Sequence, residues 1–66
     1  MKVTPIEIRT FKGRNIALLM KDDLTIRIER YIVARDYNQQ ANEWYGGGSY
    51  FTDLRDAVEC FERLSS

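Results

Sequence analysis

The spacing of apolar residues changes once along this chain, and that change constrains the fold more than any other feature. Up to about residue 52, apolar and polar residues alternate in several short runs, which is typical of strands with one buried face. From residue 53 on, apolar residues recur every third or fourth position, as on a helix with one apolar side: Leu54, Ala57, Val58, Phe61 and Leu64. The sequence therefore predicts an α+β fold in which strands come first and one helix comes last.

Three strands are predicted in the first half of the chain. Residues 4–11 alternate, with Pro5 near the start indicating a sheet edge, and residues 16–20 resume the alternation after a polar turn. A further turn at residues 21–23 leads to the third strand, residues 24–37. This run is rich in β-branched and aromatic residues and is predicted to be the longest strand.

A fourth strand is predicted to begin at residues 43–45 and to pair with the third across the polar turn 38–42. The three glycines at 46–48 predict a bend or bulge before residues 49–51. Asp53 is the expected helix N-cap. The predicted fold is a four-stranded antiparallel sheet of two consecutive hairpins, in a single domain of residues 1–66 (β-β-β-β-α). One C-terminal helix is predicted to pack on a sheet face with seven apolar residues: Ile6, Ile8, Ile16, Leu18, Ile26, Ile28 and Ile32.

Composition excludes several classes of function. The chain has 66 residues, 44% hydrophobic and 30% charged, with one cysteine and no histidine. It is therefore expected to fold, without a disulfide or a zinc site. Because histidine is the usual acid–base group at neutral pH, we expect no enzyme and no cofactor. No apolar run is long enough to cross a membrane or to act as a secretory signal, so we expect a cytoplasmic protein.

Three features that resemble chemical sites are interpreted as structural. Asp22 and Asp23 fit a turn, where aspartate binds its own backbone. Cys60 lies on the helix far from its N-terminus and fits a packing residue. The glycine run lacks the lysine and the following helix of a phosphate-binding loop.

The net charge of zero divides into +4 for residues 1–35 and −4 for residues 36–66. Two interpretations remain open. Strands and helix attract one another weakly across solvent, or a basic sheet face meets an anionic partner.

Aromatic residues and arginines gather around the second predicted hairpin. Tyrosine, tryptophan and arginine dominate binding hot spots, and the same residues stack unpaired bases on a basic sheet. The alternative is that the tyrosines only cover the two sheet faces. The candidate partner-binding residues are Arg27, Tyr31, Arg35, Tyr37, Trp44, Tyr45 and Tyr50.

Residues 48–58, Gly-Ser-Tyr-Phe-Thr-Asp-Leu-Arg-Asp-Ala-Val, resemble the end of many small uncharacterised proteins of phages and mobile elements. The resemblance implies a non-catalytic accessory factor that binds a protein partner. One such role is inhibition of a host defence complex such as a CRISPR effector, as in the anti-CRISPR proteins.

Residues 6–13 and 28–31, followed by Glu43 and Trp44, are similar to the strands of single-stranded-DNA-binding transcriptional coactivators of the positive-coactivator type. This second resemblance implies a homodimer that binds single-stranded nucleic acid. A third hypothesis is a structural or assembly subunit, which predicts a defined homo-oligomer.

Overall fold

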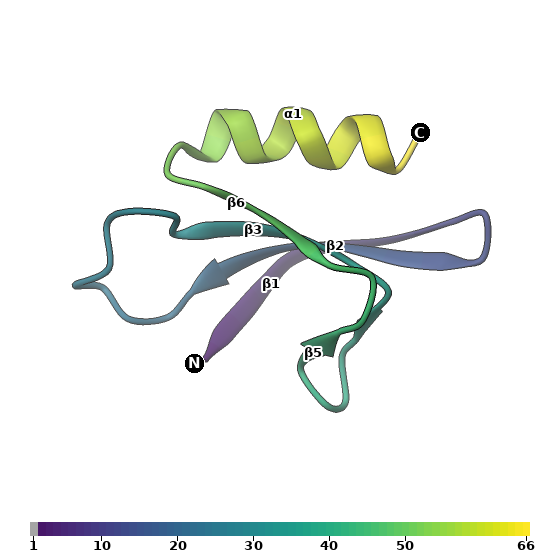
Figure 1. Ribbon diagram of the computed structural model, residues 1–66, viewed down its shortest axis with the longest axis horizontal. Helices are drawn as coiled ribbons and strands as arrows, with labels where there is room; N and C mark the ends of the chain where they lie inside the picture. Colours follow the sequence, from purple (N-terminus) through teal and green to yellow (C-terminus); the bar gives the residue numbers. More distant parts are fainter. Residues whose placement is uncertain (1) are drawn as a thin grey trace.

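The computed structural model describes residues 2–66 as a curved antiparallel sheet with a helix on one face and a short hairpin on the other (Figure 1). The sheet order is β1-β2-β3-β6, and a separate two-stranded sheet pairs β4 with β5. The elements are β1 (Val3–Phe11), β2 (Arg14–Lys21), β3 (Tyr31–Arg35), β4 (Tyr37–Asn38), β5 (Glu43–Trp44), β6 (Gly48–Phe51) and α1 (Leu54–Leu64).

The predicted fold class is confirmed: four antiparallel strands and a C-terminal helix packed against them form an α+β domain. The predicted N-cap is also confirmed, because the Asp53 side chain accepts a hydrogen bond from the Arg55 backbone N–H at 2.9 Å. The Ser65 backbone N–H donates to the Phe61 carbonyl at 3.0 Å and closes the other end of the helix.

The helix covers one face of the sheet and forms a core with it. Its buried members are Ile16, Leu18, Val33, Ala57 and Phe61. Cys60 is half-buried against this cluster, which agrees with its predicted packing role. The Arg9 guanidinium lies 4.8 Å from the centroid of the Phe61 ring, and its Nη1 lies 2.8 Å from a carboxylate oxygen of Glu62. Arg9 therefore joins β1 to the last turns of the helix.

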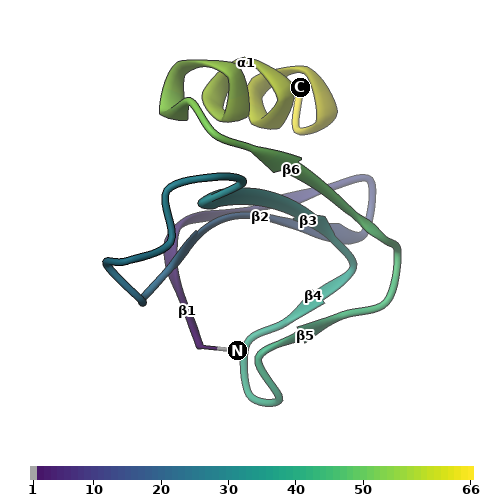
Figure 2. The same ribbon diagram turned by 60° about the vertical axis from the view of Figure 1, so that its left-hand side comes forward.

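A second core lies on the opposite face, and Figure 2 shows β4 and β5 below the curve of the sheet. Its buried residues are Val3, Ala17, Leu19, Ile32, Ala34 and Tyr37, with Ile8 and Trp44 partly buried against them. Successive strand residues point to opposite faces, so a sheet covered on both sides buries consecutive residues. This explains why all four residues 16–19 of β2 are buried.

The prediction of one long strand over residues 24–37 is wrong. The chain forms a loop over residues 22–30, β3 covers only 31–35, and Asp36 with a positive φ of 55° separates β3 from β4. The Asp23 side chain accepts hydrogen bonds from the Thr25 backbone N–H at 2.9 Å and from its hydroxyl at 2.7 Å. β2 ends at Lys21, whose backbone N–H donates to the Arg30 carbonyl at 2.9 Å, so residues 24–29 have no neighbouring strand to pair with. The alternating pattern alone does not make a strand.

The predicted composition of the helix-covered face is wrong in five positions. Ile8 and Ile32 pack in the opposite core, and Val33 lies under the helix. Ile26 and Ile28 lie in the loop. The register of β1 against β2 shifts between Pro5 and Glu7, and Ile6, at that bulge, is 48% exposed.

The predicted fourth strand is placed incorrectly as well. Glu43 and Trp44 pair with Tyr37 and Asn38 in the small hairpin, whereas β6 pairs with β3 and completes the main sheet. The predicted bend at the glycines is present at Gly46, and Gly47, with φ of +86°, leads into β6. Pro5 lies in an edge strand, as predicted.

Within the described part of the chain, the single α-helix has 11 residues, and no helix is long and apolar enough to cross a membrane.

Candidate protein-interaction surface

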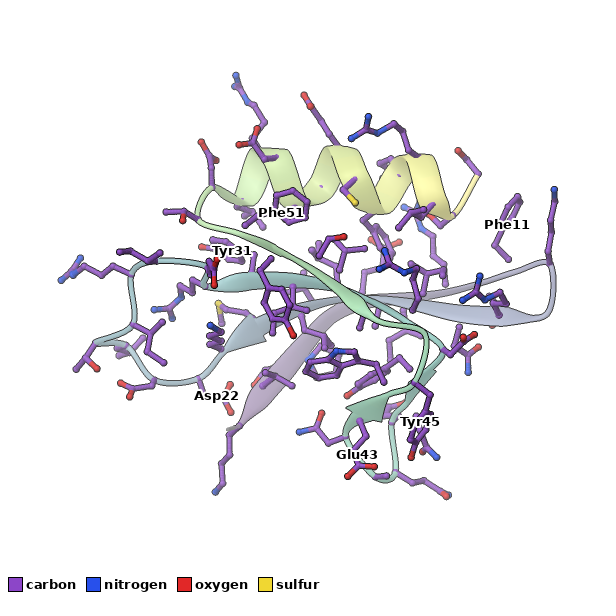
Figure 3. All side chains as sticks on the ribbon, viewed as in Figure 1. Phe11, Asp22, Tyr31, Glu43, Tyr45 and Phe51 are labelled. Carbon is purple, nitrogen blue, oxygen red and sulfur yellow. The ribbon has the colours of Figure 1, made fainter. Side chains whose placement is uncertain are left out.

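The structure separates the seven predicted partner-binding residues. Tyr45 and Tyr31 lie on different parts of the molecule, Tyr45 on the small hairpin and Tyr31 in β3 near the start of the helix (Figure 3). Of the others, Tyr37 and Trp44 belong to the hairpin, Tyr50 is in β6, Arg35 ends β3 and Arg27 is in the loop. The residues thus form one group on and around the hairpin and a second group near the β2–β3 loop.

The hairpin of β4 and β5 is built from residues with turn-forming side chains. The Asn38 side-chain oxygen accepts hydrogen bonds from the backbone N–H groups of Gln40 and Ala41, at 3.0 and 3.2 Å. Asn42 has a positive φ of 54°, a conformation that asparagine tolerates better than most residues. The polar stretch 38–42 therefore folds back tightly, as predicted for a turn.

Two aromatic residues of the hairpin serve the core rather than the surface. Tyr37 is only 3% exposed, and its hydroxyl donates to the Asn42 side-chain oxygen at 2.7 Å. Burial raises the pKa of Tyr37 above its usual value. Trp44 is half-buried, with its ring centroid 6.5 Å from that of Tyr37. These two rings anchor the hairpin against the sheet.

Hydrogen bonds fix the strand that leaves the hairpin. The Tyr45 backbone N–H donates to the Asp36 carbonyl at 3.2 Å, and the Gly46 N–H donates to the Arg35 carbonyl at 2.9 Å. The Arg35 guanidinium in turn donates to the Gly46 carbonyl at 3.0 Å. The backbone on both sides of Tyr45 is therefore held in place.

An ion pair with two hydrogen bonds lies at the base of the β4–β5 hairpin. The Arg14 guanidinium binds both carboxylate oxygens of Asp36 at 2.8 Å. This contact lowers the pKa of Asp36 and raises the pKa of Arg14. Gly46 lies against the pair, since a Cβ at that position would lie 2.8 Å from the Arg14 Nη2. A side chain at position 46 would therefore displace the ion pair.

Tyr45 is the aromatic residue that the hairpin presents to solvent. Its side chain is 66% exposed, and its hydroxyl donates to the Glu43 carboxylate at 3.0 Å. This hydrogen bond raises the pKa of Tyr45 above its usual value. Figure 3 shows Tyr45 and Glu43 together on the hairpin.

A groove of about 380 Å³ lies beside Tyr45 and is lined mainly by polar groups. The amides of Gln39 and Gln40 are exposed at its rim, and each amide both donates and accepts hydrogen bonds. Sequence reasoning assigned residues 38–42 to a turn and missed the groove. The lining residues are Gly13, Arg14, Asn15, Asp36, Tyr37, Asn38, Gln39, Gln40 and Tyr45.

Several arginines of the sheet are engaged by the chain itself. Arg9 pairs with Glu62 and Glu7, and Arg14 pairs with Asp36. The Arg35 guanidinium bonds to Gly46 and, at 3.3 Å, to the Ser49 hydroxyl. Opposite charges of the two halves of the chain therefore meet in at least two contacts, and one of them, Arg9–Glu62, joins a strand to the helix as the first interpretation of the charge division predicts.

In comparisons with known proteins, no family model matches this chain, and no curated protein or solved structure matches it either.

Proposed function

We propose that this chain is a non-catalytic protein-binding domain whose contact surface is the β4–β5 hairpin, with Tyr45 as its anchor. One observation carries the proposal: Tyr45 is 66% exposed on a hairpin whose other two aromatic rings are packed into the core. Tyrosine is one of the three residue types in which binding hot spots are enriched.

The rigidity of the hairpin supports this function. Binding costs conformational entropy when side chains and loops become ordered, and a surface that is already ordered avoids much of that cost. Here the Tyr37 hydroxyl holds the hairpin turn, and the Arg14–Asp36 ion pair holds its base. The partner therefore meets a surface of fixed shape.

The residue types around Tyr45 also suit a protein partner. Tyrosine gives a large contact area with few rotatable bonds, and asparagine and glutamine add adaptable hydrogen bonds. The groove beside Tyr45 supplies Asn38, Gln39 and Gln40. In this proposal the Tyr45 ring makes the central contact and the amides make hydrogen bonds around it.

The biological role that we propose follows from the resemblance of residues 48–58 to small proteins of phages and mobile elements. In that setting the domain acts as an accessory factor that occupies a surface of a host protein, such as a component of a defence complex. The domain needs no catalytic group for this role, because occupation of the surface is sufficient.

The test is affinity capture from a lysate of the source cells with wild type, Tyr45→Ala and Tyr45→Phe, followed by washes at rising salt concentration. A protein retained at high salt by wild type and Tyr45→Phe, and lost with Tyr45→Ala, supports the proposal. The same protein captured equally by Tyr45→Ala refutes the hairpin surface. Nucleic acid that is released as salt rises supports the single-strand-binding hypothesis instead.

A further inference from the structure

The outer edge of β1 is open. The sheet order β1-β2-β3-β6 places β1 at one side, and within residues 2–66 β2 is the strand that pairs with it. The helix packs on β2, β3 and β6, and Figure 2 shows β6 next to the helix and the start of β1 on the far side of the sheet. One side of this strand of nine residues therefore faces solvent.

The backbone groups of Ile8 and Thr10 point to this open edge. Lys12 and Gly13, both with positive φ, form the two-residue turn between β1 and β2. The two residues that flank such a turn are hydrogen-bonded to each other, and bonded and unbonded pairs alternate from there along the strands. Every second residue back from Phe11 therefore bonds to β2, and the residues between them, Ile8 and Thr10, direct their N–H and C=O groups outward.

The first part of the edge is protected against pairing with another strand, and the second part is not. Pro5 has no N–H to donate, and the register of β1 against β2 shifts between Pro5 and Glu7. Proline and bulges are common devices that prevent an edge strand from pairing. From Glu7 to Phe11 the register is regular and the sequence contains no proline. This second part of the edge is available to a partner strand.

The charges of β1 identify a second copy of β1 as the matching strand. If Ile8 of one antiparallel copy lies opposite Ile8 of the other, their outward groups bond and Glu7 of each copy lies opposite Arg9 of the other. If Ile8 instead lies opposite Thr10, Arg9 lies opposite Arg9. Opposite charges directly across two strands are stabilising, and like charges are destabilising. Charge complementarity therefore selects the register centred on Ile8.

Both charged residues are in position for this pairing. Glu7 and Arg9 are two residues apart, so they lie on the same face of the strand, where they form an ion pair. Arg9 is also held by Glu62, whose carboxylate oxygens lie 2.8 and 3.1 Å from the guanidinium nitrogens. The Glu7 side chain is 46% exposed and keeps acceptor sites for Arg9 of a second copy. Around the axis, the glutamates and arginines of the two copies then alternate in charge.

We propose that two copies of this chain associate by antiparallel pairing of their β1 edges, about a twofold axis at Ile8. A twofold interface requires a patch that is complementary to itself, and the β1 edge meets this requirement. The pairing joins the two four-stranded sheets into one continuous sheet. It also covers apolar surface, because Ile8 meets its counterpart and Ile6, which is 48% exposed, lies beside Thr10 of the other copy. The paired segment is short, so the association is reversible and the dimer fraction rises with protein concentration.

Sedimentation velocity from micromolar to near-millimolar concentration tests the association. Wild type is expected to dimerise. Glu7→Arg and Arg9→Glu should each dimerise at least about tenfold more weakly, because two facing pairs of opposite charge become pairs of like charge. An equimolar mixture of the two variants restores opposite charges in both pairs, so its affinity should return toward that of wild type. Glu59→Arg makes the same charge change at an exposed position of the helix and is the matched control. Far-UV circular dichroism confirms that every variant is folded.

Disulfide cross-linking tests the register. In a Cys60→Ala background, Ile8→Cys should form a covalent dimer under mild oxidation, because the Cα atoms of a hydrogen-bonded pair are about 5.5 Å apart, within the range of a disulfide. Thr10→Cys is the matched control on the same strand. In this register the two copies of position 10 are offset by about four residues, or about 14 Å, so this variant should cross-link much more slowly.

Each of four results overturns the proposal. Wild type stays monomeric at every concentration, Glu7→Arg dimerises as well as wild type, the mixture dimerises no better than its components, or Thr10→Cys cross-links as fast as Ile8→Cys. The proposal is independent of the proposed function. Tyr45→Ala should keep wild-type dimerisation, and Glu7→Arg should still capture the partner of the hairpin.

Discussion

Replacing Phe61 by alanine removes the largest fully buried side chain of the core under the helix. Phe61 is 1% exposed and packs with Ile16, Leu18, Val33 and Ala57. Loss of the ring removes about 2 kcal/mol of apolar burial, and an unrelaxed cavity costs roughly 2 kcal/mol more. Loss of the contact with the Arg9 guanidinium adds about 0.5–1 kcal/mol. The expected loss in the free energy of unfolding is therefore about 4.5–5 kcal/mol.

That loss is comparable to the whole stability of the domain. A chain of 66 residues with a single cysteine, which cannot form an internal disulfide, is expected to have about 3–5 kcal/mol in total. Phe61→Ala should accordingly be largely unfolded at room temperature, whereas Phe61→Leu fills most of the space and should stay folded. Leu54→Ala is the matched control on the same helix, because Leu54 is 42% exposed and should lose less than about 1 kcal/mol.

Urea unfolding followed by Trp44 fluorescence and by circular dichroism measures these differences. Trp44 packs in the opposite core, so it reports the helix-side mutation only if both cores unfold together. A folded Phe61→Ala variant that loses less than about 1 kcal/mol would refute the assignment of Phe61 to the centre of this core. Transitions that differ between the two probes would refute cooperative unfolding of the two faces.

Three further predictions concern the base of the hairpin and use the same urea assay. Gly46→Ala places a Cβ against the Arg14–Asp36 ion pair and should cost about 1–3 kcal/mol, and an unchanged urea midpoint would contradict the tight approach. Tyr37→Phe removes the hydrogen bond to Asn42 and should cost about 1 kcal/mol, and an unchanged urea midpoint would contradict a stabilising role for that bond. The pKa of Asp36 is lowered in the folded state, so its contribution is present above about pH 4 and is lost as the pH falls through the folded pKa. Asp36→Asn should be less stable than wild type at neutral pH and should lose less stability on acidification, and parallel pH profiles would count against the ion pair.

Local patterns in the sequence predicted the elements that form with little outside help. The helix stripe, the Asp53 cap and the turn chemistry of Asp23 depend on residues within a few positions of one another. The bend before Gly48 depends on glycine conformations in the same way. The α+β class follows from the change of apolar spacing, and it is confirmed.

Strand partners and buried faces depended on contacts that the sequence pattern does not contain. Residues 24–30 alternate as a strand does, yet they form a loop because β2 ends at Lys21. Ile32 and Val33 are both fully buried, so their side of the sheet follows from register and not from hydrophobicity. When both faces of a sheet are covered, residues on both faces are apolar. The alternation of apolar and polar residues then no longer shows which face is buried.

For the candidate surface, too, part was predicted by the sequence and part was decided only by the tertiary structure. The sequence by itself predicted that aromatic residues and arginines gather around the second predicted hairpin, and it determined that residues 38–42 turn back. Only the tertiary structure decided that Tyr37 is buried while Tyr45 is exposed, and that Arg27 lies in a groove with Arg30. The physical reason is that exposure is set by which face of the sheet the hairpin covers and where the loop meets the helix. Both depend on packing between residues far apart in the chain.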